Sequence, residues 1–224
     1  IAEAVVAACA PRNVPVTLKM RTGWCQQHKN AVPLARRFEA AGIQMLTVHG
    51  RTREQGYKGE AEYDTIAAVK AAVRVPVVAN GDITSPEKAR AVLAATGADA
   101  LMVGRAAQGR PWIFREIGHY LATGEHLAPP LVAEVQRLLL DHLQDHYQLY
   151  GEATGVRSAR KHIAWYVRAL PGGEALRQHI NTIEDCGAQW QAVQAYFAAL
   201  GQRMDRLPAT AAATLHEEQE GFCA

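Results

Sequence analysis

No apolar run in this 224-residue sequence approaches the roughly 20 residues of a membrane span, and its start has no basic segment followed by a signal-peptide core. These absences predict a soluble, cytoplasmic protein. The 49% hydrophobic and 21% charged residues exclude a wholly disordered chain. With 24 basic against 22 acidic residues the net charge is only +2, so a polyanion-binding surface requires local clustering. The four cysteines show no CxxC or metal-ligand spacing, which indicates reduced thiols and predicts no metal site: Cys9, Cys25, Cys186 and Cys223.

Four short apolar, β-branched runs alternate with helical patterns in the first part of the chain. The runs cover residues 14–20, 43–48, 75–79 and 98–103. Their starts recur about every 23 to 32 residues, which is the period of a βαβ unit and predicts a parallel sheet. Helical patterns follow these runs at residues 31–38, 66–73 and 112–121. A further helix is predicted to begin after the third run, with Ser85 as its N-cap and Pro86 at its first position.

A closed (β/α)8 barrel has eight strands and roughly 250 residues, so four such units correspond to about half of a barrel. A doubly wound sheet has the same spacing, but the GxGxxG fingerprint is absent after every strand. Polar residues at the carboxyl end of each strand favour the barrel, in which these ends meet on one face. They are Lys19 and Arg21, His49 and Arg51, Asn80 and Asp82, and Gly104 and Arg105.

From residue 127 onward the pattern is helical only, which predicts an all-helical domain of four helices over residues 127–201. Residues 151–155 indicate a break between two of these helices. Residues 202–224 have little periodicity and are expected to form a flexible tail. The sequence opens on Ile1 in what reads as the middle of a helix, so we expect it to be a piece of a longer protein.

The ends of the third and fourth strands have the form of a phosphate site. Gly104 and Arg105 follow one strand, and Asn80, Gly81 and Asp82 follow the other. Backbone N–H groups at a glycine turn and a bidentate arginine are donors suited to a phosphate. A tight turn that needs a positive φ is the alternative explanation for each glycine.

Other polar residues near the strand ends have both a functional and a structural interpretation. Lys19 ends an apolar strand, where it forms a salt bridge or stabilises an anion on a bound ligand. His49 is a core histidine or part of a site, because it precedes a cationic loop with Arg51 and Arg53. The alternative for Arg51 and Arg53 is a solvated loop with no binding role. Cys25 is in position for a nucleophile or proton donor, but a single cysteine in a polar loop is commonly incidental.

One predicted helix carries positive charge with little to oppose it. Between residues 151 and 170 the acidic residue is Glu152, and Trp165 and Tyr166 interleave with the cations. An RNA backbone is therefore a candidate partner for this helix, and a solvated face is the alternative. The set comprises Arg157, Arg160, Lys161 and Arg168, with His162 beside them. Helical spacing places Arg157, Lys161 and Arg168 on one stripe.

Five motifs occur in a fixed order along the chain. They are LKMRTGW at 18–24, VHGRTR at 48–53, VANGDI at 78–83, MVGRAAQGRPW at 102–112 and RSARKH at 157–162. In this combination the sequence resembles the tRNA-dihydrouridine synthases, most closely the bacterial B type, over about residues 1–200.

The resemblance implies an FMN-dependent oxidoreductase that uses NADPH to reduce uridine in tRNA to 5,6-dihydrouridine. A flipped-out uridine would meet the flavin. By matching position, Lys19 would contact the isoalloxazine ring, while Arg21 and His49 would line the flavin and the uridine. The residues implied to bind FMN are Lys19, His49, Asn80, Gly81, Asp82, Gly104 and Arg105. Those implied to bind tRNA are Arg21, Arg51, Arg53, Arg157, Arg160, Lys161, His162 and Arg168.

The sequence departs from the family in one respect. The catalytic cysteine of the family lies in an Asn-x-Gly-Cys-Pro type of motif, which this sequence lacks, and Cys25 lies downstream of that place. The resemblance therefore implies the C-terminal half of a TIM barrel over residues 1–126, inactive by itself. Two alternatives are another FMN barrel of the dihydroorotate or dihydropyrimidine dehydrogenase type and a non-catalytic RNA-binding remnant. No protein partner follows from the sequence.

Overall fold

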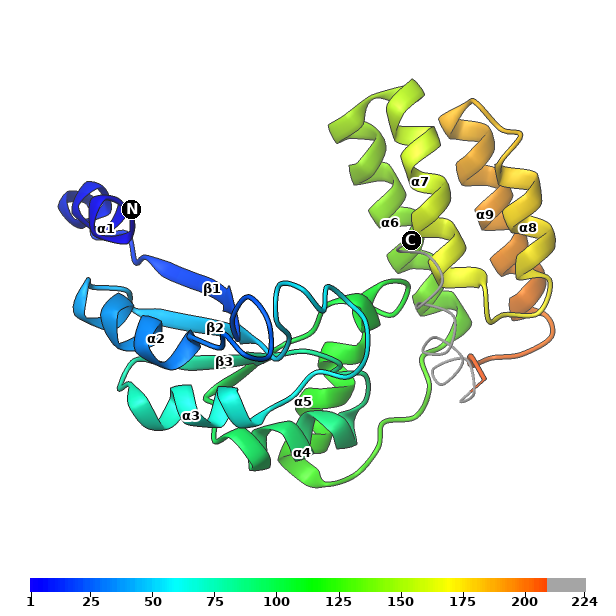
Figure 1. Ribbon diagram of the computed structural model, residues 1–224. Helices are drawn as coiled ribbons and strands as arrows, with labels where there is room; N and C mark the ends of the chain where they lie inside the picture. The colour runs from blue at the N-terminus through cyan, green and yellow to red at the C-terminus, as the bar shows by residue number, and fades with distance from the viewer. Residues whose placement is uncertain (209–224) are drawn as a thin grey trace. The chain divides into compact units, whose positions relative to one another are not determined.

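The computed structural model of this protein describes residues 1–208 and divides into two compact units (Figure 1). The first unit comprises residues 1–105 and 117–124. The second comprises residues 106–116 and 125–208. Within residues 1–208, no helix combines the length and the apolar character needed to cross a membrane.

The first unit is an α/β structure, as the sequence predicts. Its described residues form a parallel sheet of four strands in the order β1-β2-β3-β4. The strands are β1 (Thr17–Arg21), β2 (Met45–His49), β3 (Val77–Asn80) and β4 (Ala100–Met102). The helices are α1 (Ala2–Cys9), α2 (Ala31–Ala40), α3 (Asp64–Ala72) and α4 (Pro86–Thr96), with a short 3₁₀ turn at Ala10–Arg12. Helix α5 (Ile113–Thr123) and a 3₁₀ turn at Arg105–Ala107 each include residues of both units.

A local sequence signal accounts for the start of α4. Ser85 caps α4 by accepting a hydrogen bond from the Lys88 amide, and Pro86 occupies the first helical position. Helices α2, α3 and α4 lie along one side of the sheet in Figure 1. Every second residue of β2 and β3 faces these helices, and it is fully buried together with apolar residues of the helices. This set comprises Leu46, Val48, Val77, Ala79, Ile66 and Val92.

The prediction of a buried first strand is wrong in two respects. Residues 14–16 precede the strand, and Val14 is exposed. Within β1, Thr17 and Lys19 are exposed as well. The physical reason is that β1 pairs only with β2 in the described chain, so one of its long edges has no neighbouring strand to cover it.

The second unit contains α6 (Val132–Tyr150), α7 (Glu152–Val167), α8 (Gly173–Ile180) and α9 (Cys186–Gly201). Its core consists of apolar side chains from all four helices, among them Leu139, Ile163, Ile180 and Phe197. Residues 106–116 belong to this unit, and the Trp112 ring contacts the Tyr166 ring edge-on with centroids 6.2 Å apart.

Two sequence-based boundaries in this unit are wrong. The break predicted at 151–155 is confined to Gly151 (φ 71°), and Gly155 lies inside α7. A Cβ atom at Gly155 would come within 3.2 Å of the Tyr147 side chain, so this glycine permits close packing of α7 on α6.

The tail predicted to begin at residue 202 is ordered over its first part. The Leu207 amide donates to the Pro130 carbonyl, the Val132 amide donates to the Asp205 carbonyl, and the Leu207 side chain is buried. These backbone partners are distant in sequence and leave no local periodicity. Residues 209–224 of the predicted tail lie outside the described part of the chain.

Candidate functional site

Polar residues of three strands share one face of the sheet near the carboxyl ends. In the parallel register Arg21 of β1 pairs with His49 of β2, and His49 pairs with Asn80 of β3. Lys19 lies two residues before Arg21 and so points to the same face. The structure therefore brings Lys19, Arg21, His49 and Asn80 together, on the face opposite the buried apolar residues.

Asp82 organises the loops that follow β2 and β3. Both of its oxygens accept hydrogen bonds from the Arg51 guanidinium, at 2.7 and 2.8 Å, and the Ala61 amide donates to Oδ2 at 2.7 Å. Arg105 approaches Oδ1 at 3.3 Å. Burial raises the pKa of Asp82, but these hydrogen bonds and the nearby arginine charges outweigh burial and lower it. Asp82 is thus an ionised carboxylate that contacts Arg51 and Arg105 and positions both side chains.

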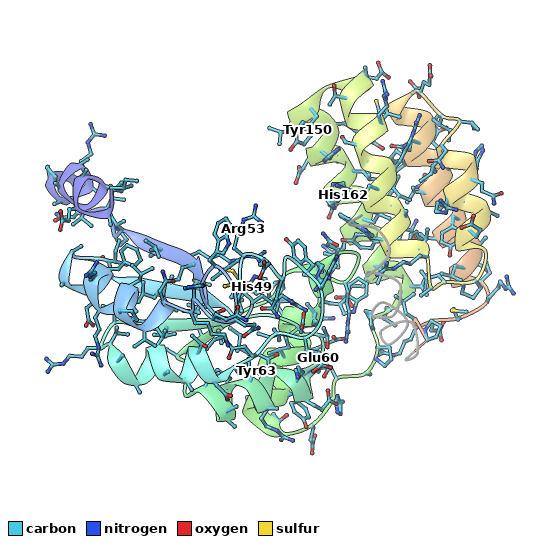
Figure 2. All side chains as sticks on the ribbon, in the orientation of Figure 1. His49, Arg53, Glu60, Tyr63, Tyr150 and His162 are labelled. Atoms are coloured by element: carbon cyan, nitrogen blue, oxygen red, sulfur yellow. The ribbon has the colours of Figure 1, made fainter. Side chains whose placement is uncertain are left out.

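Arg51, which the sequence analysis assigns to tRNA binding, is buried in this structure. Only 2% of the residue is exposed, and its guanidinium also donates to the Gly59 carbonyl. Both terminal nitrogens of the Arg51 guanidinium are thus engaged, in a bidentate pair with Asp82 and in the bond to this carbonyl. Arg53, two residues later, is exposed on the same loop (Figure 2) and remains accessible.

Arg105 lies at the centre of the cationic strand ends. Its guanidinium carbon is 5.0 Å from the centre of the Tyr57 ring, and its side chain is 32% exposed. Arg21 supports the same loop by donating to the carbonyls of Thr52 and Gly56, at 2.6 and 2.9 Å. Arg105 therefore contacts Tyr57 of the loop after β2 and Asp82 of the loop after β3, and its side chain stays partly exposed to solvent.

The two glycines predicted to form the phosphate turn have different structural roles. Gly81 has a φ of 131°, and a Cβ there would come within 2.6 Å of the Ala61 Cβ. Its carbonyl also accepts a hydrogen bond from the Tyr63 hydroxyl at 2.9 Å. Gly104 has no positive φ, and a Cβ there would meet no atom within 4 Å. The tight-turn explanation therefore applies to Gly81, whereas Gly104 leaves open space beside Arg105.

His49 is a buried, neutral imidazole among cations. Only 7% of it is exposed, and its ring lies 6.5 Å from the Tyr57 ring. Burial, followed by the charges of Arg21 and Lys19, lowers the pKa of His49 to about 4. Burial and the charge of Arg21 also lower the pKa of Lys19. An added negative charge would relieve this concentration of positive charge.

His49 makes the stability of the first unit depend on pH. The unfolded chain takes up a proton on this ring near pH 6.5, whereas the folded chain does so near pH 4. Stability is therefore expected to fall as the pH drops from about 6.5 to 4, because the unfolded state binds more protons. Hydrogen exchange of β2 and β3 amides at pH 7 and pH 5, corrected for intrinsic rates, measures this loss. His49→Gln should reduce it, and the same change at exposed His179 is the matched control. An equal loss in His49→Gln would contradict the assignment.

Cys25 is more enclosed than a polar-loop cysteine is expected to be. It is 9% exposed, and its Sγ lies 3.1 Å from Nδ1 of His28. The pair sits in the loop between β1 and α2. The thiol is therefore partnered locally with an imidazole.

The predicted basic helix exists, but its cations have different surroundings. Arg157 and Lys161 are exposed one turn apart on α7, and the Lys161 ammonium lies 5.1 Å from the Trp165 ring centre. Arg160 donates to the Ile183 carbonyl at 2.9 Å, and Arg168 is half-buried just after the last turn of α7. The exposed part of the stripe is thus Arg157 and Lys161.

His162 lies in a cluster that the sequence analysis did not identify. Its ring centroid is 5.0 Å from that of His142 and 5.2 Å from that of His146, both on α6. The spacing His142-x₃-His146 puts two imidazoles on one face of a helix and was the available sequence signal. The third histidine, on α7, is brought in by helix packing alone.

Known proteins resemble this chain over most of its length. The model of the dihydrouridine synthase family matches residues 1–201. The tRNA-dihydrouridine synthase B of Pseudomonas putida is 56% identical over 205 residues, covering 92% of this chain and 61% of the relative. The protein of the same name from Pseudomonas aeruginosa is 57% identical over 198 residues, which cover 88% of this chain and 60% of the relative. That from Salmonella typhimurium is 58% identical over 185 residues, which cover 83% of this chain and 58% of the relative. This chain thus spans about three fifths of these curated relatives, and it belongs to the dihydrouridine synthase family.

Proposed function

We propose that the protein carrying this chain reduces uridine in tRNA to 5,6-dihydrouridine, with FMN as cofactor and NADPH as reductant. The observation that carries the proposal is the convergence of Lys19, Arg21 and Arg105 at the strand ends, in a chain of this family. Residues 1–126 would form the C-terminal half of a TIM barrel, and residues 127–201 the helical tRNA-binding domain.

The strand ends suit an anionic cofactor. Four cations lie there with Asp82 between two of them, and Gly104 leaves space next to Arg105. Asp82 and Tyr57 hold Arg105 from two sides, so the guanidinium is ordered before a ligand arrives. An ordered, partly exposed guanidinium beside open space is the donor that a phosphate group requires.

The residues of this chain would divide the binding of FMN among them. Arg105 and the backbone after Gly104 would hold the phosphate, and Asn80 and Gly81 would line the ribityl chain. Lys19 would donate a hydrogen bond to the isoalloxazine ring, next to neutral His49. Asp82 would act indirectly, by holding Arg105. When bound, FMN supplies hydride transfer from NADPH to the uracil ring.

The exposed cations of α7 support contact with the tRNA backbone. Arg157 and Lys161 lie on one face, and Lys161 stacks on Trp165. Arg53 would add a cation at the mouth of the flavin site. Arg160 and Arg168 would support α7 through their contacts within the helical unit.

The α7 cations should account for part of the salt dependence of tRNA binding. Arg157→Gln with Lys161→Gln removes two phosphate contacts, so the slope of log affinity against log salt should flatten by about 1.4 to 1.8. Filter-binding titrations between low and physiological salt measure the slope. The matched control, Arg36→Gln with Arg37→Gln, removes two exposed charges from α2. Equal flattening in both variants would show a general charge effect and reject the α7 interface.

The activity itself is tested by incubating the protein with FMN, NADPH and an unmodified tRNA transcript. We expect nucleoside mass spectrometry to find a uridine that has gained two hydrogens, with matching NADPH consumption. NADPH oxidation by a bound flavin with no change in tRNA would favour a different FMN oxidoreductase. tRNA binding without flavin retention would indicate an RNA-binding protein. Either result would contradict the proposal.

A further inference from the structure

Three histidines from two helices converge in the second unit. His142 and His146 lie one turn apart on α6, and His162 faces them from α7. One ligand nitrogen from each residue lies within 4.8 Å of the other two. His146 is 8% exposed, while His142 and His162 are half-buried, so the cluster is enclosed on one side and open to solvent on the other.

We propose that His142, His146 and His162 bind a divalent transition-metal ion of the Zn²⁺ class, with water as a fourth ligand. Neutral imidazoles prefer such ions, and three histidines with one open position form a recognised tetrahedral set. Zn–N bonds of about 2.0–2.1 Å require ligand nitrogens about 3.3 Å apart. The ligand nitrogens, which lie within 4.8 Å of one another, would move closer together on binding by rotation of the side chains on α6 and α7.

The hydrogen bonds around His146 prepare one ring for coordination. The Ser158 hydroxyl donates to the Thr154 carbonyl at 2.6 Å, so its oxygen accepts the bond from Nε2 of His146 at 2.7 Å. This assignment places the proton on Nε2 and leaves the lone pair on Nδ1. A hydrogen bond to the second ring nitrogen is the usual way that proteins orient a metal-binding histidine.

The rings of His146 and His162 also pack against the rings of Tyr150 and Trp165, with centroids 4.6 and 5.1 Å apart, but ring packing does not use the ring nitrogens. Within residues 1–208, the bond to Ser158 is the one hydrogen bond made by a ring of these three histidines, so most of their ring nitrogens have no protein partner. Coordination requires the neutral form of each imidazole ring. A bound ion would tie α6 to α7.

The test uses the tag-free 224-residue chain after dialysis against a chelator, titrated with Co²⁺ and then with Zn²⁺. We expect one equivalent of Co²⁺ to produce the visible absorption of a tetrahedral site, and Zn²⁺ to remove it. His142→Gln and His162→Gln should each weaken binding by at least the 10–100-fold that loss of an outer-sphere partner costs. Circular dichroism confirms that each variant keeps its helices.

Two controls separate this site from other ligands in the chain. His179→Gln removes an exposed histidine of α8, and Cys186→Ser disrupts a separate group with Glu152 and Asp185. Both variants should bind the metal as the parent does. Absence of stoichiometric binding by the parent chain, or loss of binding in Cys186→Ser, would overturn the proposal. If the histidine variants unfold, X-ray absorption of the Zn²⁺-loaded parent chain identifies the ligands directly. A sulfur ligand, or a coordination shell without imidazole nitrogens, would overturn the proposal.

Discussion

Asp82→Asn is expected to destabilise the first unit by about 3 kcal/mol, the low end of the cost of leaving one partner of a buried ion pair unpaired. Arg51 is almost fully buried, and Asp82 is its anionic partner through two hydrogen bonds. The new amide would also direct N–H groups at a guanidinium or at the Ala61 amide, so donors would face donors. Urea dependence of hydrogen exchange in β2 and β3 reports the stability of this unit separately from the helical one.

A surface ion pair supplies the matched comparison. Glu174 and Arg177 form a bidentate pair on α8, but both side chains are about half exposed. Glu174→Gln should therefore change the stability of the helical unit little, because solvent screens an exposed pair. If Asp82→Asn cost no more than Glu174→Gln, Asp82 would not be the hub of the strand-end loops. Arg51→Met in the Asp82→Asn background should recover part of the loss, because it removes the uncompensated charge.

Arg105→Ala is expected to weaken FMN binding by about 1.5–3 kcal/mol, the range for a hydrogen bond to a charged group. The corresponding loss of affinity is roughly 10- to 150-fold. Riboflavin has the same ring and ribityl chain but no phosphate, so its binding should change little. Flavin fluorescence titrations with both ligands, on the protein that carries this chain, measure the difference.

The comparison between ligands protects this test from indirect effects. Loss of Arg105 also removes a contact to Asp82 and the stacking on Tyr57, and a disordered loop would weaken both flavins alike. Equal losses for FMN and riboflavin would thus remove Arg105 from the phosphate site. Arg53→Ala, which removes an exposed cation from the loop after β2, should leave FMN affinity close to that of the parent.

Local chemistry was sufficient to predict most of the secondary structure. Apolar runs predicted β2 and β3 to within a few residues, and Ser85 with Pro86 predicted the start of α4. These features depend on neighbours within one or two turns, which the sequence displays directly. The parallel arrangement also followed, because strands separated by helices can pair only through crossovers.

The errors have a common physical cause. Gly155 looked like a helix break, yet it lies in α7 because Tyr147 of the neighbouring helix occupies the space of its missing side chain. Residues 202–208 looked loose, yet they bond to residues near 130. In each case the deciding partner lies in another element of the structure, and tertiary packing overrides local preference.

The sequence by itself determined the strand-end motifs, and with them the family to which this chain belongs. Only the tertiary structure decided which of those polar residues remain available. It buries Arg51 against Asp82, leaves Arg105 partly exposed, and gathers His162 with two histidines of another helix. The reason is that charge and spacing are written in the sequence, whereas burial and contact depend on which segments fold against each other.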